Sequence, residues 1–431
     1  MWVRLQLDFG WNDFAYAMSQ VFWNRHESAS QAEITSHWPQ GQALPVLSVR
    51  SGFDLLLGTM KWPAGGEIIC SALNIPDMTM VARENGIVPV PADLDAEQLA
   101  PRLDLIERAI TAKTQAILIA HLYGSFVPLE PILDLARRHG LMVIEDCAEN
   151  FDGVYQGHPD ADVSLFSFGP LKTATSLAGG ILKTRDADLF ARLVAAQDNW
   201  PVQSRWDYFN RLNKYGTMRF FGSKWLYGAV RSGIKMAVGD VDKLIHHTAK
   251  SFRPDEIMTR LRQRPCGPLL ASMARRFACF DHERIEQRVA NGRYLASQLR
   301  GRVPCPAADV ESHNYWLFPA LVREPAKAIV ALEAAGFDAT RAESMCAISA
   351  PADRSDLEPA CAKELLDRMI LLPCYPGIPE DELRRMADVL IEVEASSAHV
   401  EAMRATRQPA DTTYEKVGRE TDMIQEEAAA S

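Results

Sequence analysis

The sequence lacks any uninterrupted apolar stretch of the roughly 20 residues that a membrane-spanning helix needs. Its first residues, up to Trp11, also lack the apolar core and small-residue cleavage site of a secretory signal. We therefore expect the chain to work in the cytoplasm and not inside a bilayer.

An excess of positive charge is also missing. The chain has 46 Lys and Arg against 56 Asp and Glu, which gives a formal net charge of -10. Such a balance argues against a general nucleic-acid-binding protein. No two of the eight cysteines form a CxxC pair or a zinc-ligand spacing. We expect reduced thiols, mostly buried, and no metal site.

What the chain does have is the composition of an ordinary soluble enzyme. Its 431 residues are enough for two or three domains and a large core. Its hydrophobic content of 47% and charged content of 24% are typical of globular proteins.

The most informative stretch lies in the second hundred residues. An apolar run, Val143-Ile-Glu-Asp-Cys-Ala-Glu149, ends in acids, as a buried parallel strand does where its carboxyl end meets a pocket. A second run, Ser164 to Ser167, leads through a Gly-Pro turn to Lys172, and the paired glycines Gly179-Gly180 follow. Strands alternate with helical segments here, which predicts a parallel sheet with ligands at the carboxyl ends of its strands.

Asp146 and Lys172 together indicate a particular chemistry. A neutral lysine amine can attack a carbonyl and form a Schiff base. Pyridoxal phosphate needs such a lysine and a carboxylate that keeps its ring nitrogen protonated. Each residue alone also has an ordinary interpretation, because a strand-end Asp usually caps a turn and a Lys usually lies in solvent. The pair, in this setting, favours the cofactor.

The motifs around this pair resemble the DegT/DnrJ/EryC1/StrS family of pyridoxal-phosphate-dependent sugar aminotransferases. The matching segments are Ala120-His-Leu-Tyr-Gly124, Val143 to Ala148, Phe166-Ser-Phe-Gly-Pro-Leu-Lys172 and Gly179-Gly180. The resemblance runs, with one gap, from about Val46 to about Ile391. It implies a fold-type I α/β enzyme, with a large domain built on a mostly parallel sheet and a smaller α/β C-terminal domain. It also implies a homodimer with the active site near the interface.

The resemblance assigns roles to individual residues. Lys172 would be the catalytic lysine, and Asp146 would hold the ring nitrogen. Ser167 would bind the cofactor phosphate, together with the backbone of Gly52 and Phe53 at a helix start. Phe53 stands where the family has a threonine, so one hydroxyl contact is lost.

Other positions depart from the family pattern. Glu149 stands where the family usually has His or Gln near the cofactor ring, and Ile75 where it has an aromatic wall. No asparagine occurs in the segment around Arg264, where the family has one that reaches the partner subunit. We expect Glu149 to contact the cofactor nonetheless.

By this resemblance we expect the chain to move an amino group from glutamate or glutamine to a keto sugar that is linked to a nucleotide. A dehydratase or epimerase with the same cofactor is an alternative, but the dehydratase branch replaces the lysine with histidine, so Lys172 favours transamination. A second alternative is an aminotransferase for a lipid-linked substrate at a membrane surface. A third is a non-catalytic, cofactor-binding regulatory protein.

The sequence divides into five segments. We expect an aromatic-rich N-terminal arm, a cofactor-binding domain, an insertion, a helix with the small C-terminal domain, and a polar, disordered tail. Their residue ranges are 1–45, 46–199, 200–264, 265–403 and 404–431.

The insertion at 200–264 mixes aromatic and basic residues, from Trp206 to Lys235, within an otherwise acidic chain. Three interpretations compete. It could be a helical segment packed on the body with its bases in water. It could lie on anionic lipid through residues 200–253, which would make a peripheral membrane protein. It could instead line a pocket for a phosphorylated or nucleotide-linked substrate.

Overall fold

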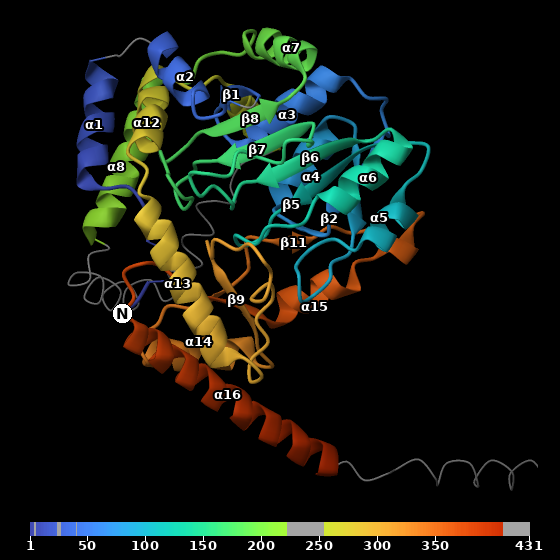
Figure 1. The fold of residues 1–431 in the computed structure, drawn as a ribbon, viewed down its shortest axis with the longest axis vertical. Helices are drawn as coiled ribbons and strands as arrows, with labels where there is room; N and C mark the ends of the chain where they lie inside the picture. Colours follow the sequence, from blue (N-terminus) through green and yellow to red (C-terminus); the bar gives the residue numbers. More distant parts are fainter. Residues whose placement is uncertain (4–5, 24–26, 40, 222–253, 408–431) are drawn as a thin grey trace, which may run out of the picture.

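The computed structural model describes residues 1–3, 6–23, 27–39, 41–221 and 254–407. A large α/β body occupies the upper part of Figure 1, and a smaller α/β unit lies below it, bordered by the long helix α16. About half of the expected insertion, residues 222–253, and most of the expected tail, residues 408–431, lie outside the described residues.

A seven-stranded sheet forms the centre of the large body, in the order β1-β8-β7-β6-β5-β2-β4. Strands β7, β6, β5, β2 and β4 pair in parallel, and β8 runs antiparallel to both of its neighbours. The strands are β1 (Gln42–Val46), β2 (Glu67–Ser71), β4 (Val88–Ala92), β5 (Thr114–Ala120), β6 (Met142–Cys147), β7 (Val163–Ser167) and β8 (Gly180–Thr184). The mostly parallel sheet expected from strand–helix alternation is confirmed.

Helices cover both faces of this sheet, because its strands are apolar on both sides. One face packs against α3 (Val49–Met60), α4 (Pro76–Glu84), α7 (Ala187–Gln197) and α11 (Pro254–Leu261). The other packs against α5 (Leu103–Ala109) and α6 (Glu130–His139) in one half, and against α1 (Trp11–Phe22), α2 (Glu27–Thr35), α8 (Arg205–Phe221) and α12 (Gly267–Ala278) in the other. Neighbouring residues of one strand therefore face different helix layers.

The smaller unit is the expected C-terminal α/β domain. Its three-stranded antiparallel sheet has the order β10-β12-β9. Its elements are α13 (His282–Leu299), β9 (Phe318–Leu321), α14 (Pro325–Ala334), β10 (Thr340–Arg341), α15 (Ala360–Arg368), β12 (Met369–Leu372) and α16 (Glu380–Arg407). A two-stranded sheet joins the two units by pairing β11 (Cys346–Ala347) with β3 (Leu73–Asn74) of the large body.

Two of the expected segment boundaries fall inside elements of the structure. The N-terminal arm was expected to end at residue 45, but β1 crosses this boundary and is an edge strand of the large sheet. The start of the chain lies on the small domain, where Trp2 pairs with Phe337. The expected tail begins inside α16, which continues to Arg407.

The described part of the insertion supports the first of its three interpretations. Helix α8 lies beside α1 and α12 (Figure 1), and its Tyr208 and Leu212 side chains are buried. The Tyr208 hydroxyl donates to the carbonyl of Ser176 at 3.0 Å. Among the helices within the described ranges, none is long and apolar enough to cross a membrane.

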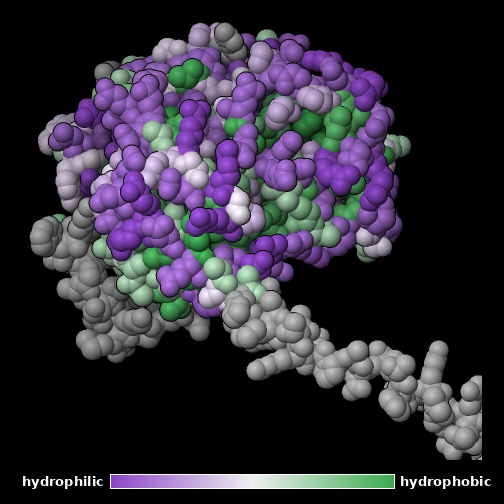
Figure 2. All heavy atoms as spheres, turned by 60° about the horizontal axis from the view of Figure 1, so that its bottom comes forward, coloured by the Kyte–Doolittle hydropathy of each residue, from purple (hydrophilic) through white to green (hydrophobic). Residues whose placement is uncertain are grey.

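The surface is mostly hydrophilic on the face shown in Figure 2, with smaller groups of hydrophobic side chains between the polar ones. All eight cysteines are free thiols, and four of them are buried.

Candidate active site

Asp146 lies at the carboxyl end of β6, on the sheet face covered by α3. Its side chain is buried, and its Oδ1 accepts the backbone N–H of Ala148 at 3.0 Å. Burial raises the pKa of Asp146 to about 6, and the nearby Glu149 adds to the rise while the Ala148 amide and Lys172 oppose it. Burial disfavours the carboxylate anion of Asp146, and a protonated ring nitrogen beside it would stabilise that anion.

Lys172 stands in the loop between β7 and β8. The loop folds back on itself, since the Lys172 amide donates to the Gly169 carbonyl at 3.1 Å. Two non-glycine residues of this loop, Ala174 and Leu177, adopt left-handed φ values of 53° and 66°. Such backbone conformations are costly and are often found at functional sites.

Glu149 bridges the lysine and the sheet. Its Oε1 lies 3.1 Å from the Lys172 Nζ, and its Oε2 accepts the backbone N–H of Tyr123 at 2.7 Å. The structure thus brings Lys172, Glu149 and Asp146 together, as the sequence predicts. An acid at position 149 is tolerated here because both of its oxygens have donors.

The small domain closes this site through one segment, His313 to Trp316. The Lys172 ammonium lies 3.7 Å from the ring centroid of Trp316, a cation–π contact. The Trp316 indole N–H donates to the Leu171 carbonyl at 2.8 Å, and the Asn314 amide donates to the Glu149 carbonyl at 3.3 Å. Trp316 was not singled out from the sequence, because nothing local places it beside a lysine 144 positions earlier.

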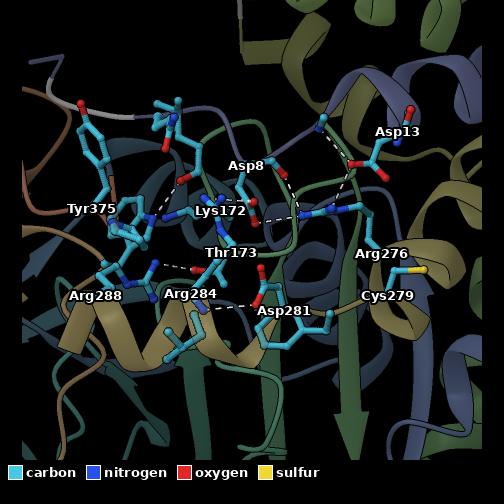
Figure 3. A pocket seen from close by; sticks show the side chains of 18 of the residues that line it. Asp8, Asp13, Lys172, Thr173, Arg276, Cys279, Asp281, Arg284, Arg288 and Tyr375 are labelled. Carbon is cyan, nitrogen blue, oxygen red and sulfur yellow. Dashed lines mark hydrogen bonds and ion pairs between the residues drawn. The ribbon is translucent and has the colours of Figure 1, made fainter. Parts of the chain in front are cut away.

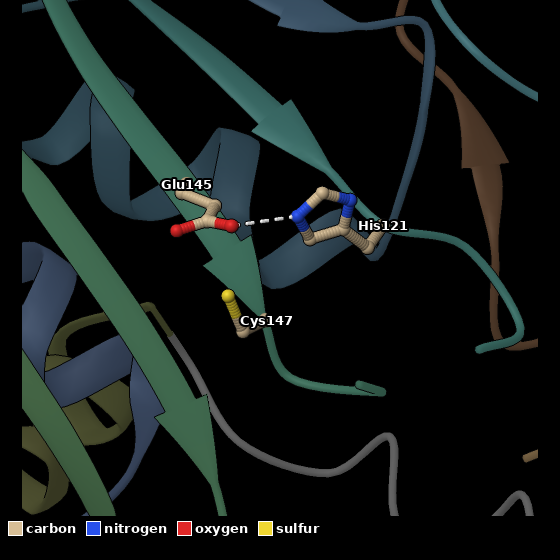
Figure 4. A group of neighbouring side chains, drawn as sticks. All are labelled: His121, Glu145 and Cys147. Carbon is tan, nitrogen blue, oxygen red and sulfur yellow. Dashed lines mark hydrogen bonds and ion pairs between the residues drawn. The ribbon is translucent and has the colours of Figure 1, made fainter. Parts of the chain in front are cut away.

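Glu145, next to Asp146 on β6, faces the opposite side of the sheet and organises a buried hydrogen-bond network (Figure 4). It accepts from His121 Nε2 at 2.9 Å, Ser164 Oγ at 2.8 Å, the His158 amide at 2.9 Å and the Tyr155 hydroxyl. Burial acts to raise the pKa of Glu145, but the bonds from His121 and Tyr155 outweigh it and bring the pKa down to about 2.

His121 has both ring nitrogens engaged in this network. Its Nδ1 accepts the Val127 amide at 3.0 Å, so Nε2 carries the proton that goes to Glu145. His121, Glu145 and Cys147 lie close together, but the histidine has no lone pair left for a metal ion. His121 therefore has a structural role: the network anchors β6 behind Asp146.

The expected phosphate cradle is displaced by one helical turn. Helix α3 begins at Val49, with Ser48 as its N-cap, so the amides of Ser51 and Gly52 are already bonded to Ser48. A side chain on Gly52 would face the sheet, 3.4 Å from Leu165. Phe53 is only 1% exposed and packs in the core. Gly52 and Phe53 therefore serve packing, because the helix starts earlier than the sequence comparison assumed.

The first turn of α3 offers a cradle nonetheless. The amides of Val49 and Arg50 have no partner within the helix, which makes its N-terminus a site for an anion. Ser167 ends β7 opposite Gly180 of β8. A Cβ on Gly180 would lie 3.0 Å from the backbone of both Ser48 and Val49, so only glycine allows this approach. Ser167 and the α3 N-terminus thus meet, as the paired glycines predict.

A cavity of about 460 Å³ opens beside Lys172, which is one of its lining residues (Figure 3). Its walls come from the N-terminal segment, the α12–α13 junction, the lysine loop and the small domain. Asp8, Asp13, Thr173, Arg276, Arg284 and Arg288 are among its lining residues. The sequence gave no local signal for this cavity, because its walls are far apart along the chain.

The Arg264 side chain makes its contacts within its own chain. Its guanidinium lies 3.0 Å from Asp198 of the same chain, and its backbone pairs with Val202. The pairing of Arg264 with Val202 thus joins the two ends of the insertion that the structure describes.

Comparison with known proteins agrees with the resemblance seen in the sequence. Residues 26–217 match the model of the DegT/DnrJ/EryC1/StrS aminotransferase family. The chain is 35% identical over 170 residues to a UDP-4-amino-4-deoxy-L-arabinose–oxoglutarate aminotransferase of Shewanella sediminis, covering 38% of this chain and 42% of that protein. It is 36% identical over 166 residues to a GDP-perosamine synthase of Caulobacter vibrioides, covering 36% and 43%. The matches thus span about two-fifths of the relatives' length.

The fold is shared over a longer range. The aminotransferase TlmJ of Streptoalloteichus hindustanus superposes with a TM-score of 0.66 at 17% identity, covering 92% of this chain and 100% of that one. This likeness, with the sheet order above, establishes the fold-type I architecture. Residues 26–217 are thus similar to the DegT/DnrJ/EryC1/StrS aminotransferase family, and the wider likeness is one of fold.

Proposed function

We propose that the protein is a pyridoxal-phosphate-dependent aminotransferase that transfers an amino group from glutamate or glutamine to a nucleotide-linked keto sugar. The observation that carries this proposal is the convergence of Lys172, Glu149 and the buried Asp146 at the carboxyl end of β6. Two of the relatives are named for amino sugars carried on UDP or GDP. The Shewanella relative is also named for oxoglutarate, the keto acid that corresponds to glutamate.

The residues present fit the cofactor. Asp146 is a buried carboxyl with a raised pKa, and no ion pair is recorded for it within the described residues. The protonated ring nitrogen of the cofactor would be the positively charged partner that the Asp146 carboxylate lacks. Lys172 would hold the aldehyde end. Ser167 and the free amides of Val49 and Arg50 would hold the phosphate.

Bound at this site, the cofactor supplies an electron sink for the carbon that loses its proton. Lys172 carries a primary amine on a flexible stem, and we propose that it moves that proton as general base and then general acid. Asp146 keeps the ring nitrogen protonated. Glu149 holds the lysine amine on the pocket side through its bond to Tyr123. Trp316 covers the lysine and limits the access of water.

Exchange of Lys172 for Ala tests the proposal. The parent protein incubated with pyridoxal phosphate should gain a visible absorbance band that borohydride fixes to the chain. The variant should gain none, while Lys113→Ala, an exposed control, should behave as the parent. Glutamate or glutamine should then convert the bound cofactor of the parent to its amine form. A protein that takes up the cofactor but is unchanged by every amino donor would instead be non-catalytic.

We further propose that the protein works as a homodimer, as the resemblance implies. Six large apolar side chains of α1, α8 and the residue after α1 are about half exposed or more: Trp11, Phe22, Trp23, Trp206, Met218 and Phe220. We call these six residues the aromatic face. A surface of this kind usually binds another protein or a membrane, and we favour a second copy of the chain over anionic lipid.

A further inference from the structure

Four arginines line the cavity beside Lys172, and three of them are paired with acids of the N-terminal segment. Arg275 lies 3.3 Å from Asp13. Arg276 lies 2.9 Å from Asp8 and 3.0 Å from Asp13, and Arg284 lies 3.4 Å from Asp8. Each of these three guanidinium groups therefore has an acidic partner within the chain, although they share two carboxylates.

Arg288 is different. Its Nε donates to the Asn314 carbonyl at 2.7 Å, and its Nη1 donates to the Thr173 hydroxyl at 3.2 Å. Both partners are neutral, and no ion pair to Arg288 occurs within the described residues. Its Nη2 is shielded from solvent and donates to nothing there. Burial lowers the pKa of this guanidinium to about 10, which reflects the cost of an unpaired charge in this position.

A second donor without an acceptor lies near Arg288. His313 accepts the Tyr315 amide at its Nδ1, at 2.8 Å, so the proton is on Nε2. That Nε2 is buried and unpartnered. Burial, and then the charge of Arg288, lower the pKa of His313 to about 3, so the ring stays neutral. An unpaired cation and an unpaired donor together indicate a missing anion.

We propose that Arg288 binds the carboxylate of the amino donor. Thr173, which fixes the guanidinium, follows Lys172 directly, and Figure 3 shows Arg288, Thr173 and Lys172 on the same wall of the cavity. The donor's carboxylate is attached to the carbon that carries the reacting amine, so it must lie close to Lys172. A planar guanidinium with free N–H groups matches a carboxylate in two parallel hydrogen bonds.

Inorganic phosphate is the competing anion for this site. Asp8 and Asp13 also line the cavity, but both are paired with its arginines and do not by themselves exclude a phosphate. The proposal rests on the proposed function for the identity of the ligand, but the anion site can be tested without the cofactor.

The test measures the binding of glutarate, a dicarboxylate without an amine, to the full-length, cofactor-free protein by calorimetry. We expect Arg288→Gln to weaken glutarate binding by about tenfold or more. Arg293→Gln removes the same charge from an exposed position of the same helix and should leave the affinity unchanged. Equal affinity in the parent and Arg288→Gln would overturn the proposal, as would a parent that binds inorganic phosphate and not glutarate.

Thermal unfolding distinguishes a ligand-binding role of Arg288 from a structural one. Removing an unpaired buried charge should raise the melting temperature of the ligand-free protein, whereas loss of a structural residue would lower it. Thr173→Val tests the same site without touching the charge, and should also weaken glutarate binding. If the protein never takes up pyridoxal phosphate while glutarate binding still depends on Arg288, the proposed function fails and the carboxylate site stands.

Discussion

Glu149 holds the Lys172 Nζ at 3.1 Å with one oxygen and the Tyr123 amide at 2.7 Å with the other. The reactive amine is thus held by a full negative charge, where the family resemblance places a neutral amide or imidazole. This contact must be broken before the lysine amine can attack an aldehyde. Under the proposed function, Glu149 therefore competes with the cofactor for Lys172.

Glu149→Gln should relieve this competition. A glutamine keeps an oxygen for the Tyr123 amide but lacks the charge, so we expect cofactor uptake at neutral pH to become several-fold faster. The measurement is the rate at which the visible band appears when pyridoxal phosphate is added to cofactor-free protein. Glu364→Gln, a surface exchange far from the lysine, should show the parental rate. Slower uptake in Glu149→Gln would mean that the carboxylate helps to position the cofactor.

Asp146 should make the ligand-free protein less stable at neutral pH. Its pKa rises from 3.8 to about 6 on folding. A raised acid pKa means that folding disfavours the anion, so the penalty is absent below pH 3.8 and complete above about pH 6. Asp146→Asn should therefore stabilise the ligand-free protein at pH 8 by on the order of 3 kcal/mol, and hardly at all near pH 3.

The same exchange should abolish the use of the cofactor, because asparagine cannot hold a positive ring nitrogen. In the parent protein, cofactor affinity should fall as the pH drops below about 6 and Asp146 takes up its proton. Urea unfolding across this pH range, and spectroscopic titration with pyridoxal phosphate, measure the two effects separately. A variant that is destabilised at pH 8 would show that Asp146 has a stabilising partner inside the chain.

Glu145 should behave in the opposite way, because four donors hold its anion. Its pKa is lowered from 4.5 to about 2, so its contribution to stability is complete above pH 4.5 and is lost as the pH falls towards 2. We expect Glu145→Gln to lower the free energy of unfolding at pH 7 by about 3 kcal/mol. The difference from the parent should shrink in acid, and urea unfolding at pH 7 and pH 3 measures it.

The sequence was sufficient for the centre of the site and insufficient for its walls. Asp146, Ser167 and Lys172 follow strands whose apolar runs are visible locally, and the carboxyl ends of parallel strands meet at one sheet edge. The start of α3 was misplaced because Ser48 and Ser51 are both good N-caps, and only the backbone distinguishes them. Trp316 and Arg288 come from a different domain, and no local pattern links them to a lysine more than a hundred residues earlier.

Gly180→Ala tests the displaced phosphate cradle. An added Cβ would lie 2.8 Å from the Phe166 carbonyl and 3.0 Å from the first turn of α3, so the helix start must move. We expect the affinity for pyridoxal phosphate to fall by about tenfold or more, since a shift of the amides weakens their bonds to the phosphate. Gly169→Ala is the matched control, because its Cβ would meet only Ser167 Oγ, at an ordinary 3.7 Å. Equal losses in both variants would place the phosphate elsewhere.

Substitutions in the aromatic face test the proposed homodimer. The side chains of Phe22, Trp23, Trp206 and Phe209 contact one another in edge-to-face geometry, so the face is already ordered in one chain. Docking a second copy against it would remove a large apolar area from water. We expect the parent to sediment as a dimer and the double variant Trp23→Ser/Trp206→Ser to shift towards the monomer. Val330→Ser, which removes a 66% exposed apolar side chain from α14, should leave the assembly unchanged. A parent that is monomeric in solution but sediments with anionic vesicles at low salt would assign the same face to a membrane surface instead, since electrostatic attraction to lipid weakens with salt.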